Sequence, residues 1–219
     1  MHKGFFYQTH EYPYMKIAII GTGNVGAALA QKWAIADHDI FLGVRQLDSF
    51  KGGELLSKEN IKVCPVKEAV QKSDIILLAT PATAAIEVAE SLGNTEGKII
   101  IDAMNIVMGK GPVGYENTTD AVLDHTNTED VVKCFNTTGF NNIQNTQYGD
   151  LSLDMFVAGN SRVGKETAIQ LAKDAGFAEC YDIGGNEKFE LMEQFAWFWI
   201  NLALFQGQGR EIGFALLKR

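Results

Sequence analysis

The chain has 219 residues, of which 46% are hydrophobic and 21% are charged, and its formal net charge is -8. This length and composition suit one folded unit with a substantial core and argue against a disordered chain. The acidic balance argues against nucleic acid as a main partner, because binding to phosphates needs a basic surface.

The N-terminus and the cysteines both bear on the compartment. Residues 1–14 lack the long apolar run and the small-residue cleavage site of a secretory signal, and we interpret them as an extension before a domain that begins at Met15. Cys64, Cys134 and Cys180 form no CxxC motif and no Cys/His cluster. Neither a disulfide framework nor a metal site is therefore expected, and a reducing cytoplasm fits.

The stretch KIAIIGTGNVGAALA, residues 16–30, places a glycine-rich turn between a predicted strand at 16–20 and a predicted helix at about 24–36. In a GxGxxG turn the first glycine permits the tight turn, the second lets the pyrophosphate approach, and the third lets the helix pack close to the strand. The helix N-terminus then offers free N–H groups to the phosphates. The predicted phosphate loop consists of Gly21, Thr22, Gly23, Asn24, Val25 and Gly26.

The second predicted strand, residues 39–44, is followed by Arg45, where domains that bind NAD typically carry an acidic residue. Gly43 leaves room at this point, and the guanidinium group has a fixed charge and a fork of donors suited to a phosphate. The pattern favours NADP as cofactor, with Ser49 and Lys51 as further contacts. A solvated arginine at a strand end is the alternative interpretation of Arg45.

Further apolar runs predict strands at 61–64, 74–80, 98–105, 130–136, 155–160 and 178–183, with helices at 81–92 and 163–175. These runs are apolar almost throughout, which indicates strands covered on both faces. With helices between them, they predict an α/β fold: a Rossmann-type, doubly wound, mostly parallel sheet. We expect residues 15–185 to form an NADP-binding domain and residues 186–219 to form a C-terminal helical appendage.

Three strand ends are expected to face the nicotinamide, because ligands of this fold lie beyond the carboxyl ends of the strands. The candidates at these ends are Ala79, Thr80, Pro81, Asn105, Asn136 and Thr137. The polar side chains in this set can hydrogen-bond to a ligand without ionising. Asn and Thr are equally common as helix caps and in turns, so a structural role for each stays open.

No Ser-His-Asp order, HExxH motif or pair of carboxylates stands out, and we assign no catalytic residue. His125 is interpreted as exposed on a short helix, and Asp102 as a strand-end residue near the cofactor. Reduction of a carbonyl needs a proton donor beside the hydride, usually Lys, His or Tyr. Hydride exchange between two redox cofactors needs mainly stacking and alignment, and the sequence favours this second reaction.

The stretch QFAWFWINLALFQGQG, residues 194–209, could be mistaken for a membrane span. Its strongly apolar part, residues 195–205, is shorter than the roughly 20 residues that a bilayer requires. We interpret it as a buried helix with apolar side chains nearly all round. Core packing alone, a homodimer contact, and stacking of Trp197 or Trp199 on a cofactor are the open explanations.

Taken in order, KIAIIGTGNVGAALA, FLGVR, SDIILLATP, KIIIDAMN, VVKCFNTTG and FVAGN resemble the NADP oxidoreductases dependent on the deazaflavin coenzyme F-420. The cytosolic reductase domain of the STEAP metalloreductases belongs to the same superfamily. The resemblance spans about residues 16–199 and is specific as a set. It implies that residues 21–26 hold the pyrophosphate and that Arg45 holds the 2′-phosphate.

The resemblance also implies roles at the strand ends. Thr80, Pro81 and Asn105 would border the nicotinamide, and Asn136 and Thr137 would border the second redox partner. The family often has proline after the asparagine that ends the fifth strand, whereas this chain has isoleucine at position 106. The following segment, residues 107–120, is distinctive and lies where the second substrate would dock.

These observations predict a cytoplasmic, homodimeric, NADP-dependent oxidoreductase without nucleic-acid, membrane or metal partners. It would pass hydride between NADP(H) and a second small-molecule redox substrate, for which a deazaflavin (coenzyme F-420) or a flavin is the candidate. An NADPH-dependent reductase of a small carbonyl or imine is one alternative. An NADP-binding sensor without turnover is another.

Overall fold

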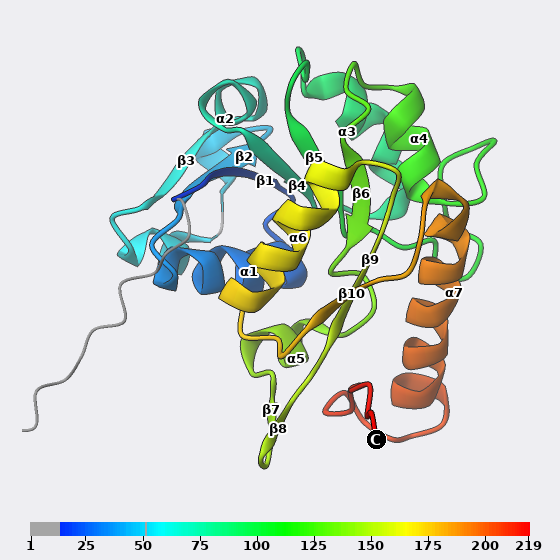
Figure 1. The fold of residues 1–219 in the computed structure, drawn as a ribbon. Coiled ribbons are helices and arrows are strands. Elements are labelled where there is room, and N and C mark those ends of the chain that lie inside the picture. The colour runs from blue at the N-terminus through cyan, green and yellow to red at the C-terminus, as the bar shows by residue number, and fades with distance from the viewer. Residues whose placement is uncertain (1–13, 51) are drawn as a thin grey trace, which may run out of the picture.

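The computed structural model describes residues 14–50 and 52–219, so the predicted extension lies outside the described residues except for Tyr14 (Figure 1). One sheet has the strand order β10-β9-β6-β5-β4-β1-β2-β3. Its strands are β1 (Lys16–Ile20), β2 (Asp39–Val44), β3 (Ile61–Pro65), β4 (Ile75–Leu78), β5 (Ile99–Asp102), β6 (Val131–Cys134), β9 (Met155–Ala158) and β10 (Cys180–Asp182). Strands β1 to β6 run parallel, and β9 joins β6 antiparallel. The predicted mostly parallel, doubly wound sheet is confirmed.

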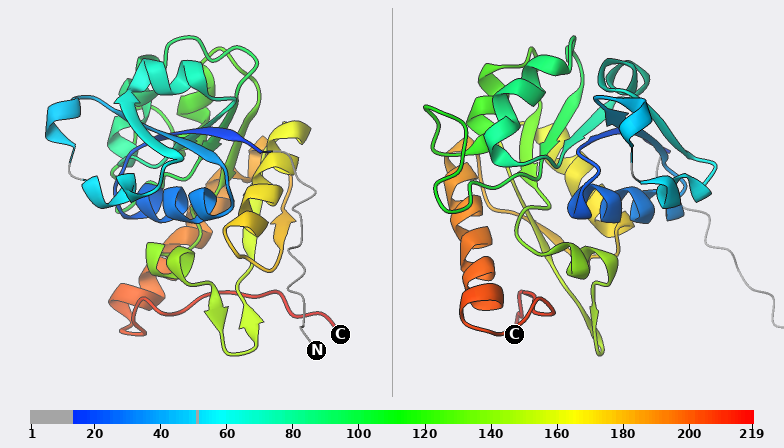
Figure 2. Two further views of the ribbon diagram at one scale, coloured as in Figure 1. Left: turned by 90° about the vertical axis from the view of Figure 1, so that its left-hand side faces the viewer. Right: turned by 180° about the vertical axis from the view of Figure 1, so that it is seen from behind.

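Helices cover both faces of this sheet (Figures 1 and 2). The helices α1 (Asn24–Ile35) and α6 (Arg162–Asp174) pack on one face, and α2 (Val66–Lys72), α3 (Ala85–Ser91) and α4 (Thr118–Asp124) pack on the other. Alternate residues of β1 enter the two cores: Ile17 and Ile19 join the first, and Ala18 and Ile20 join the second. The strand sequence is apolar throughout because both of its faces are buried.

The strands end earlier than predicted. The predicted strands 74–80, 98–105 and 130–136 stop at Leu78, Asp102 and Cys134, because beyond these residues the chain leaves the parallel ladder. The predicted helix 81–92 is divided into a 3-10 turn, Ala82–Ala84, and α3. The candidate residues at the strand ends therefore lie in loops at the carboxyl edge of the sheet.

Several short elements were not predicted from the sequence. They are α2, the 3-10 turns Leu47–Ser49, Gly53–Ser57 and Asn186–Lys188, the helix α5 (Phe140–Gln144), and the hairpin strands β7 (Gln147–Tyr148) and β8 (Leu151–Ser152). Their apolar patterns are too short to stand out in the sequence, because a periodic pattern needs roughly 11 residues to be recognised. Figure 1 shows the β7–β8 hairpin projecting from the lower end of the molecule.

The C-terminal segment is helical only in part, and the expectation of helix through residue 219 is wrong. The helix α7 (Phe189–Ile200) continues as a π-helical turn, Asn201–Phe205, and residues 206–219 have no regular structure. Gly207 and Gly209 have φ angles of 71° and 78°, in the left-handed region that glycine tolerates and that ends a helix. Figure 2 shows the final segment turning back below α7.

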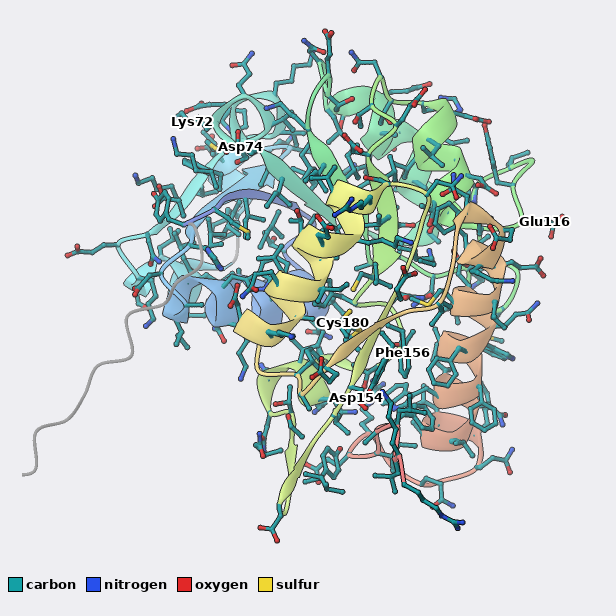
Figure 3. All side chains as sticks on the ribbon, in the orientation of Figure 1. Lys72, Asp74, Glu116, Asp154, Phe156 and Cys180 are labelled. Carbon is teal, nitrogen blue, oxygen red and sulfur yellow. The ribbon has the colours of Figure 1, made fainter. Side chains whose placement is uncertain are left out.

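The returning segment is fastened to the sheet. The backbone N–H of Asp154 donates to the carbonyl of Phe214, and its carboxylate accepts from the N–H of Leu216. Figure 3 labels Asp154 and, further along β9, Phe156. Phe156 meets Phe195 of α7 edge-on at a centroid distance of 5.3 Å. Among the described residues, no helix is long and apolar enough to cross a membrane.

Candidate functional site: a cavity at the carboxyl ends of β1 and β4

A cavity of about 730 Å³ opens where β1 and β4 end. These strands are neighbours in the sheet, and the chain passes from β1 to β2 and β3 on one side before it returns to β4 on the other. In open α/β sheets such a reversal of strand order leaves a crevice in which ligands bind. The cavity walls come from the loop after β1, the end of β2 and the residues after it, the loop after β4, and α3.

The three glycines of the loop after β1 have different surroundings. Gly21 has a φ of 104°, and a Cβ atom there would meet the carbonyl oxygen of Ala79 at 2.4 Å. A Cβ atom at Gly26 would meet the carbonyl oxygen of Gly21 at 1.9 Å, whereas a Cβ atom at Gly23 would find nothing within 4 Å. Gly21 and Gly26 are thus required by the packing of the loop. Gly23 faces open space that a pyrophosphate can occupy.

The N-terminus of α1 lies at this open space. Gly23 is its N-cap residue, no side chain caps the helix, and no acidic residue occupies its first turn. Asn24, Val25 and Gly26 form that first turn, in which the backbone N–H groups have no partner within the helix. These N–H groups and the positive end of the helix dipole can hold phosphate oxygens. Thr22 lines the cavity beside them.

Arg45 also lines the cavity, and the structure places an acidic residue opposite it. The side chain of Arg45 is 86% exposed, and its Nη1 atom lies 3.6 Å from Oε1 of Glu87 on α3, which is 71% exposed. An ion pair as exposed as this is weak and easily replaced. The guanidinium group can therefore turn to a phosphate. Of the two further contacts predicted for that phosphate, Lys51 and the side chain of Ser49 lie outside the described residues.

Glu87 was not identified from the sequence. It lies within the predicted helix 81–92, but no spacing in the sequence indicates that this helix face meets the end of β2. Arg45 and Glu87 are the ionisable residues among those that line the cavity in the described part of the chain. No lysine, histidine or tyrosine is present in that lining.

The loop after β4 supplies the cavity wall next to the glycine loop. Ala79, Thr80 and Pro81 all line the cavity. The hydroxyl of Thr80 donates to the sulfur of Met104 at 3.1 Å. This contact joins the cavity wall to the loop that follows β5.

Asn105, Asn136 and Thr137 lie behind the cavity wall and do not line the cavity. The Nδ2 atom of Asn105 donates to the carbonyl of Asn136 at 2.8 Å, and Nδ2 of Asn136 donates to Oδ1 of Asn105 at 2.9 Å. Thr137 is 3% exposed and donates to the sulfur of Met155. The two asparagines therefore tie the ends of β5 and β6 together.

The backbone at the end of β6 is strained. Phe135 has a φ of 63°, a conformation that is rare for a bulky residue, and its ring is fully buried edge-on against Trp33. This turn directs the next residue, Asn136, toward Asn105 and the carbonyl of Met192 on α7. The Oδ1 atom of Asn136 is buried without a hydrogen-bond partner among the described residues. Strain and an unpaired polar atom next to a cavity are typical of functional regions.

A buried ionic cluster lies next to this region, and the sequence reasoning missed it. The Nζ atom of Lys133 on β6 lies 2.9 Å from Oδ2 of Asp102 and 2.8 Å from Oε1 of Glu193. Thr118 and Thr119 at the start of α4 both donate to the same oxygen of Asp102. Asp102 and Lys133 are fully buried and Glu193 is 5% exposed.

This cluster gives Asp102, which ends β5 as expected, a place among buried side chains. Asp102 does not line the cavity, and its carboxylate is occupied by Lys133 and the two threonines. The available signal was a lysine within the otherwise apolar run VVKC, which pairs in register with Asp102 of β5. His125 follows α4 as its C-cap residue, where its ring lies 3.2 Å from Oε1 of Glu90.

The two tryptophans of α7 do not line the cavity. Trp199 is 4% exposed and covers Gly139, where a Cβ atom would meet its ring at 2.5 Å. Its indole N–H donates to the carbonyl of Ile212 in the returning segment. Trp197, Phe198, Leu204 and Phe205 are between 38% and 57% exposed, so packing among the described residues does not cover them.

Comparisons with known proteins agree with this architecture. A protein from Methanothermobacter marburgensis named F420-dependent NADP reductase is 25% identical over 210 residues, which cover 86% of this chain and 92% of the relative. A crystal structure from Arthrobacter sp. FB24, described as a candidate F420-dependent NADP reductase, has a TM-score of 0.76 at 22% identity and covers 93% of this chain and all of that one. A Streptomyces aurantiacus imine reductase has a TM-score of 0.64 at 14% identity over 87% of this chain and 61% of that one, a likeness in fold alone.

The family model described as "NADP oxidoreductase coenzyme F420-dependent" matches residues 16–106, from the start of β1 into the loop after β5. This range contains the glycine loop, Arg45 and the loop after β4, which together make most of the cavity wall. The resemblance of the chain to the NADP oxidoreductases dependent on coenzyme F420 is therefore confirmed, with residues 16–106 carrying the sequence pattern of that family.

Proposed function

We propose that this protein is an NADP-dependent oxidoreductase that passes hydride between NADP(H) and a deazaflavin of the coenzyme F420 type. The observation that carries the proposal is the cavity at β1 and β4, where open space at Gly23 meets the uncapped N-terminus of α1, with Arg45 in the same wall. These residues fit a dinucleotide that carries an additional phosphate. NADP would supply the hydride chemistry through its nicotinamide ring.

The residues of the cavity would bind and orient the cofactor. The first turn of α1 would hold the pyrophosphate through its N–H groups, and Arg45 would exchange Glu87 for the 2′-phosphate. Thr80 and Pro81 would border the nicotinamide from the loop after β4. Asn105 would border the nicotinamide from the loop after β5, and Asn136 and Thr137 would border the side on which the second substrate enters.

The choice of a redox acceptor over a carbonyl compound is supported by two observations. The relative from Methanothermobacter marburgensis is named F420-dependent NADP reductase and aligns over most of this chain. In the described part of the cavity lining, no lysine, histidine or tyrosine is placed to donate a proton. Reduction of a carbonyl or imine needs such a donor, whereas exchange between two redox rings depends on alignment.

The test is an acceptor panel. Purified protein and NADPH are incubated with coenzyme F420, a free flavin, a quinone, a small carbonyl compound and an imine, and the loss of reduced nicotinamide is followed by its absorbance. We expect turnover with the deazaflavin above all others. Turnover confined to the carbonyl or imine would replace this proposal with the reductase alternative. NADPH binding without turnover of any acceptor would favour a sensor.

We also propose that two copies of the chain associate through the last turn of α7 and the π-helical turn that follows it. Phe198, Leu204 and Phe205 are each about half exposed there, and Trp197 packs against Phe205 at a centroid distance of 5.8 Å. Exposed apolar groups gathered in one region are typical of an interface. A cytoplasmic location is part of the same proposal, and it is supported by three free, buried cysteines.

A further inference from the structure

Glu193 holds both ends of one loop. The loop, residues 103–117, joins β5 to α4. The Oε2 atom of Glu193 accepts from the backbone N–H of Ile106 at 2.7 Å, and Oε1 accepts from the backbone N–H of Thr118 at 2.9 Å. Glu193 lies on α7, so a single carboxylate fastens this helix to the first residues of the loop and to the residue that follows it (Figure 1).

The same cluster holds the start of the loop at two more points. Oδ1 of Asp102 accepts from the N–H of Met104 at 2.8 Å, and Nζ of Lys133 donates to the carbonyl of Met104 at 3.1 Å. The Met104 sulfur in turn accepts from Thr80, which lines the cavity. A continuous series of contacts thus leads from α7 through the buried cluster to the cavity wall.

The middle of the loop is exposed. Val107 and Lys110 form a short bridge around a tight turn, and Met108 and Val113 are 70% and 91% exposed. Figure 3 shows Glu116 of this loop pointing outward beside the upper end of α7. The hydroxyl of Tyr115 donates to Asp124 of α4. The position of this exposed segment therefore depends on how its two ends are held.

Neutralising Lys133 does not by itself explain Glu193. Asp102 already provides one carboxylate for the one ammonium group, and a second buried carboxylate adds a desolvation cost. What Glu193 adds is acceptor capacity, because its two oxygens receive Lys133 and the backbone N–H groups at both ends of the loop. The second carboxylate thus serves the loop.

We infer that Glu193 is a positioning residue for the second redox substrate. It holds the loop 103–117, and with it Asn105, at a defined place relative to the cavity. The adjacent residue of α7, Met192, holds Asn136 through its carbonyl. The residues on the side of the second substrate are therefore held by α7. This helix lies outside residues 16–106, which make most of the NADP cavity. This inference rests on the proposed function.

Glu193→Gln provides the first test, because the variant changes one end of the loop selectively. Lys133 and the N–H of Thr118 still require an oxygen at the position of Oε1, so the amide nitrogen must take the position of Oε2. There it faces the N–H of Ile106, and two donors meet. Exchange of the Ile106 amide hydrogen should become faster by about 10- to 150-fold, the loss expected for a bond to a charged group. Exchange at Thr118 should change far less.

The second measurement separates binding from alignment. With Glu193→Gln, the KM for the deazaflavin should rise and kcat/KM should fall by about tenfold or more, because small misplacements of reacting groups are costly. The Kd for NADPH, measured by calorimetry, should stay within about twofold, since no residue of the NADP cavity is altered. A purely structural role of Glu193 would lower the melting temperature, but it would not raise the KM for the deazaflavin while the Kd for NADPH stays the same.

The matched control is Glu190→Gln. Glu190 is exposed on the same helix, one turn earlier, and its carboxylate accepts from Nε2 of Gln194 at 2.7 Å. Neither amide exchange in the loop nor any kinetic constant should change. If Glu193→Gln fails to fold, Ile106→Pro removes the loop N–H, together with the side chain that packs against Gly111, and leaves the charges of the ionic cluster unaltered. The same rise in KM is expected from that variant.

Wild-type KM and kcat in Glu193→Gln, or in Ile106→Pro, would overturn the inference, even if exchange at Ile106 is faster. Equal losses in NADPH binding and in acceptor turnover would overturn it too, because the cluster would then act on the whole fold. If the unaltered protein transfers hydride to no acceptor of the panel, the proposed function fails and the role in acceptor binding fails with it. These outcomes are distinguishable, since the first two require an active wild-type enzyme.

Discussion

The three glycines of the phosphate loop, Gly21, Gly23 and Gly26, have two different roles. Gly21 and Gly26 sit against backbone carbonyls that no side chain could displace, so their role is to close the loop. Gly23 has open space before it and an extended backbone, with a φ of -72°, that any residue can adopt. A side chain at position 23 would therefore be tolerated by the fold and not by a ligand.

Gly23→Val is expected to abolish NADP binding and to leave the fold intact, because the branched side chain would fill the space of the pyrophosphate. Calorimetry with NADPH and a thermal melt measure the two effects. Gly26→Val is the matched control, because its Cβ atom would meet the carbonyl oxygen of Gly21 at 1.9 Å and unfold the loop. Normal NADPH affinity in the Gly23 variant would show that the phosphates bind elsewhere.

Arg45→Asp is expected to erode or reverse a preference for NADPH over NADH. A charge-assisted contact to the 2′-phosphate contributes roughly 1.5–3 kcal/mol, which is about 10- to 150-fold in affinity. The Kd values of both cofactors, measured by calorimetry at one ionic strength, give the ratio. Equal affinities for the two cofactors in the unaltered protein would contradict the assignment of Arg45.

Glu87→Gln is expected to act in the opposite direction. The carboxylate competes for Arg45 at 3.6 Å and would repel the 2′-phosphate, so its neutral analogue should bind NADPH more tightly. Both side chains are exposed, and the gain should be only about two- to fivefold and should shrink in high salt. The NADH affinity should change less. A loss of NADPH affinity in this variant would mean that Glu87 contacts the cofactor directly.

At the scale of elements, β5, β6, α4 and α7 meet at one buried lysine. Lys133 replaces an apolar residue in the middle of β6, and its ammonium group is satisfied by Asp102, Glu193, Thr118, Thr119 and the carbonyl of Met104. Such a cluster orients the elements that contribute to it, and removal of one carboxylate leaves buried donors without an acceptor. The carboxyl ends of these strands therefore depend on it for their arrangement.

Asp102→Asn is expected to lower the free energy of unfolding by about 1.5–3 kcal/mol, because the neutral amide replaces a carboxylate that accepts from Lys133, the two threonines and the N–H of Met104. Urea denaturation measures it. The kcat of this variant should stay within about tenfold of the unaltered value, as is expected when no general acid is removed. This limit on kcat applies to the folded fraction of the variant. An unchanged urea midpoint would contradict the buried ion pair.

His125→Ala is the companion variant on the exposed side of the same region. His125 contacts Glu90 at 3.2 Å and lies away from the cavity lining. Both kcat and stability should stay near those of the unaltered protein, because hydride exchange between redox rings requires no side-chain acid. A thousandfold loss of kcat with normal NADPH affinity exceeds what remote packing explains and would favour the carbonyl reductase alternative.

At the scale of the whole molecule, α7 and the returning segment form a second layer beside the sheet. Phe195 packs between Phe156 of β9 and Phe214 of the returning segment. The outer side of this layer keeps Phe198, Leu204 and Phe205 about half exposed. The helix is thus buried on the side that faces its own sheet and apolar on the side that faces away, as expected for an element shared between two copies.

Phe198→Asp combined with Phe205→Asp is expected to convert a dimer into a monomer, because two buried charges without partners oppose association. Sedimentation velocity measures the oligomeric state, and circular dichroism checks that the helix content is unchanged. Val163→Asp, at a single exposed apolar position on α6, is the control and should stay dimeric. A monomeric unaltered protein would exclude the proposed association.

The sequence alone determined the features that depend on neighbours along the chain. The strands at 16–20, 39–44 and 61–64, the helix after Asn24 and the GxGxxG turn all follow from local apolar patterns and from glycine geometry. The order of these motifs was also enough to predict the family and the doubly wound sheet. Such features involve residues that are close in sequence, so their physical cause is visible in it.

The tertiary structure decided which distant residues meet. Glu87 comes to face Arg45, Lys133 is balanced by both Asp102 and Glu193, and the last residues turn back to Asp154. No local propensity specifies these contacts, because each is the result of packing α3, α7 and the strand ends against one another. Charged residues are mostly exposed in folded proteins, and only the packed fold shows which of them are buried and paired here.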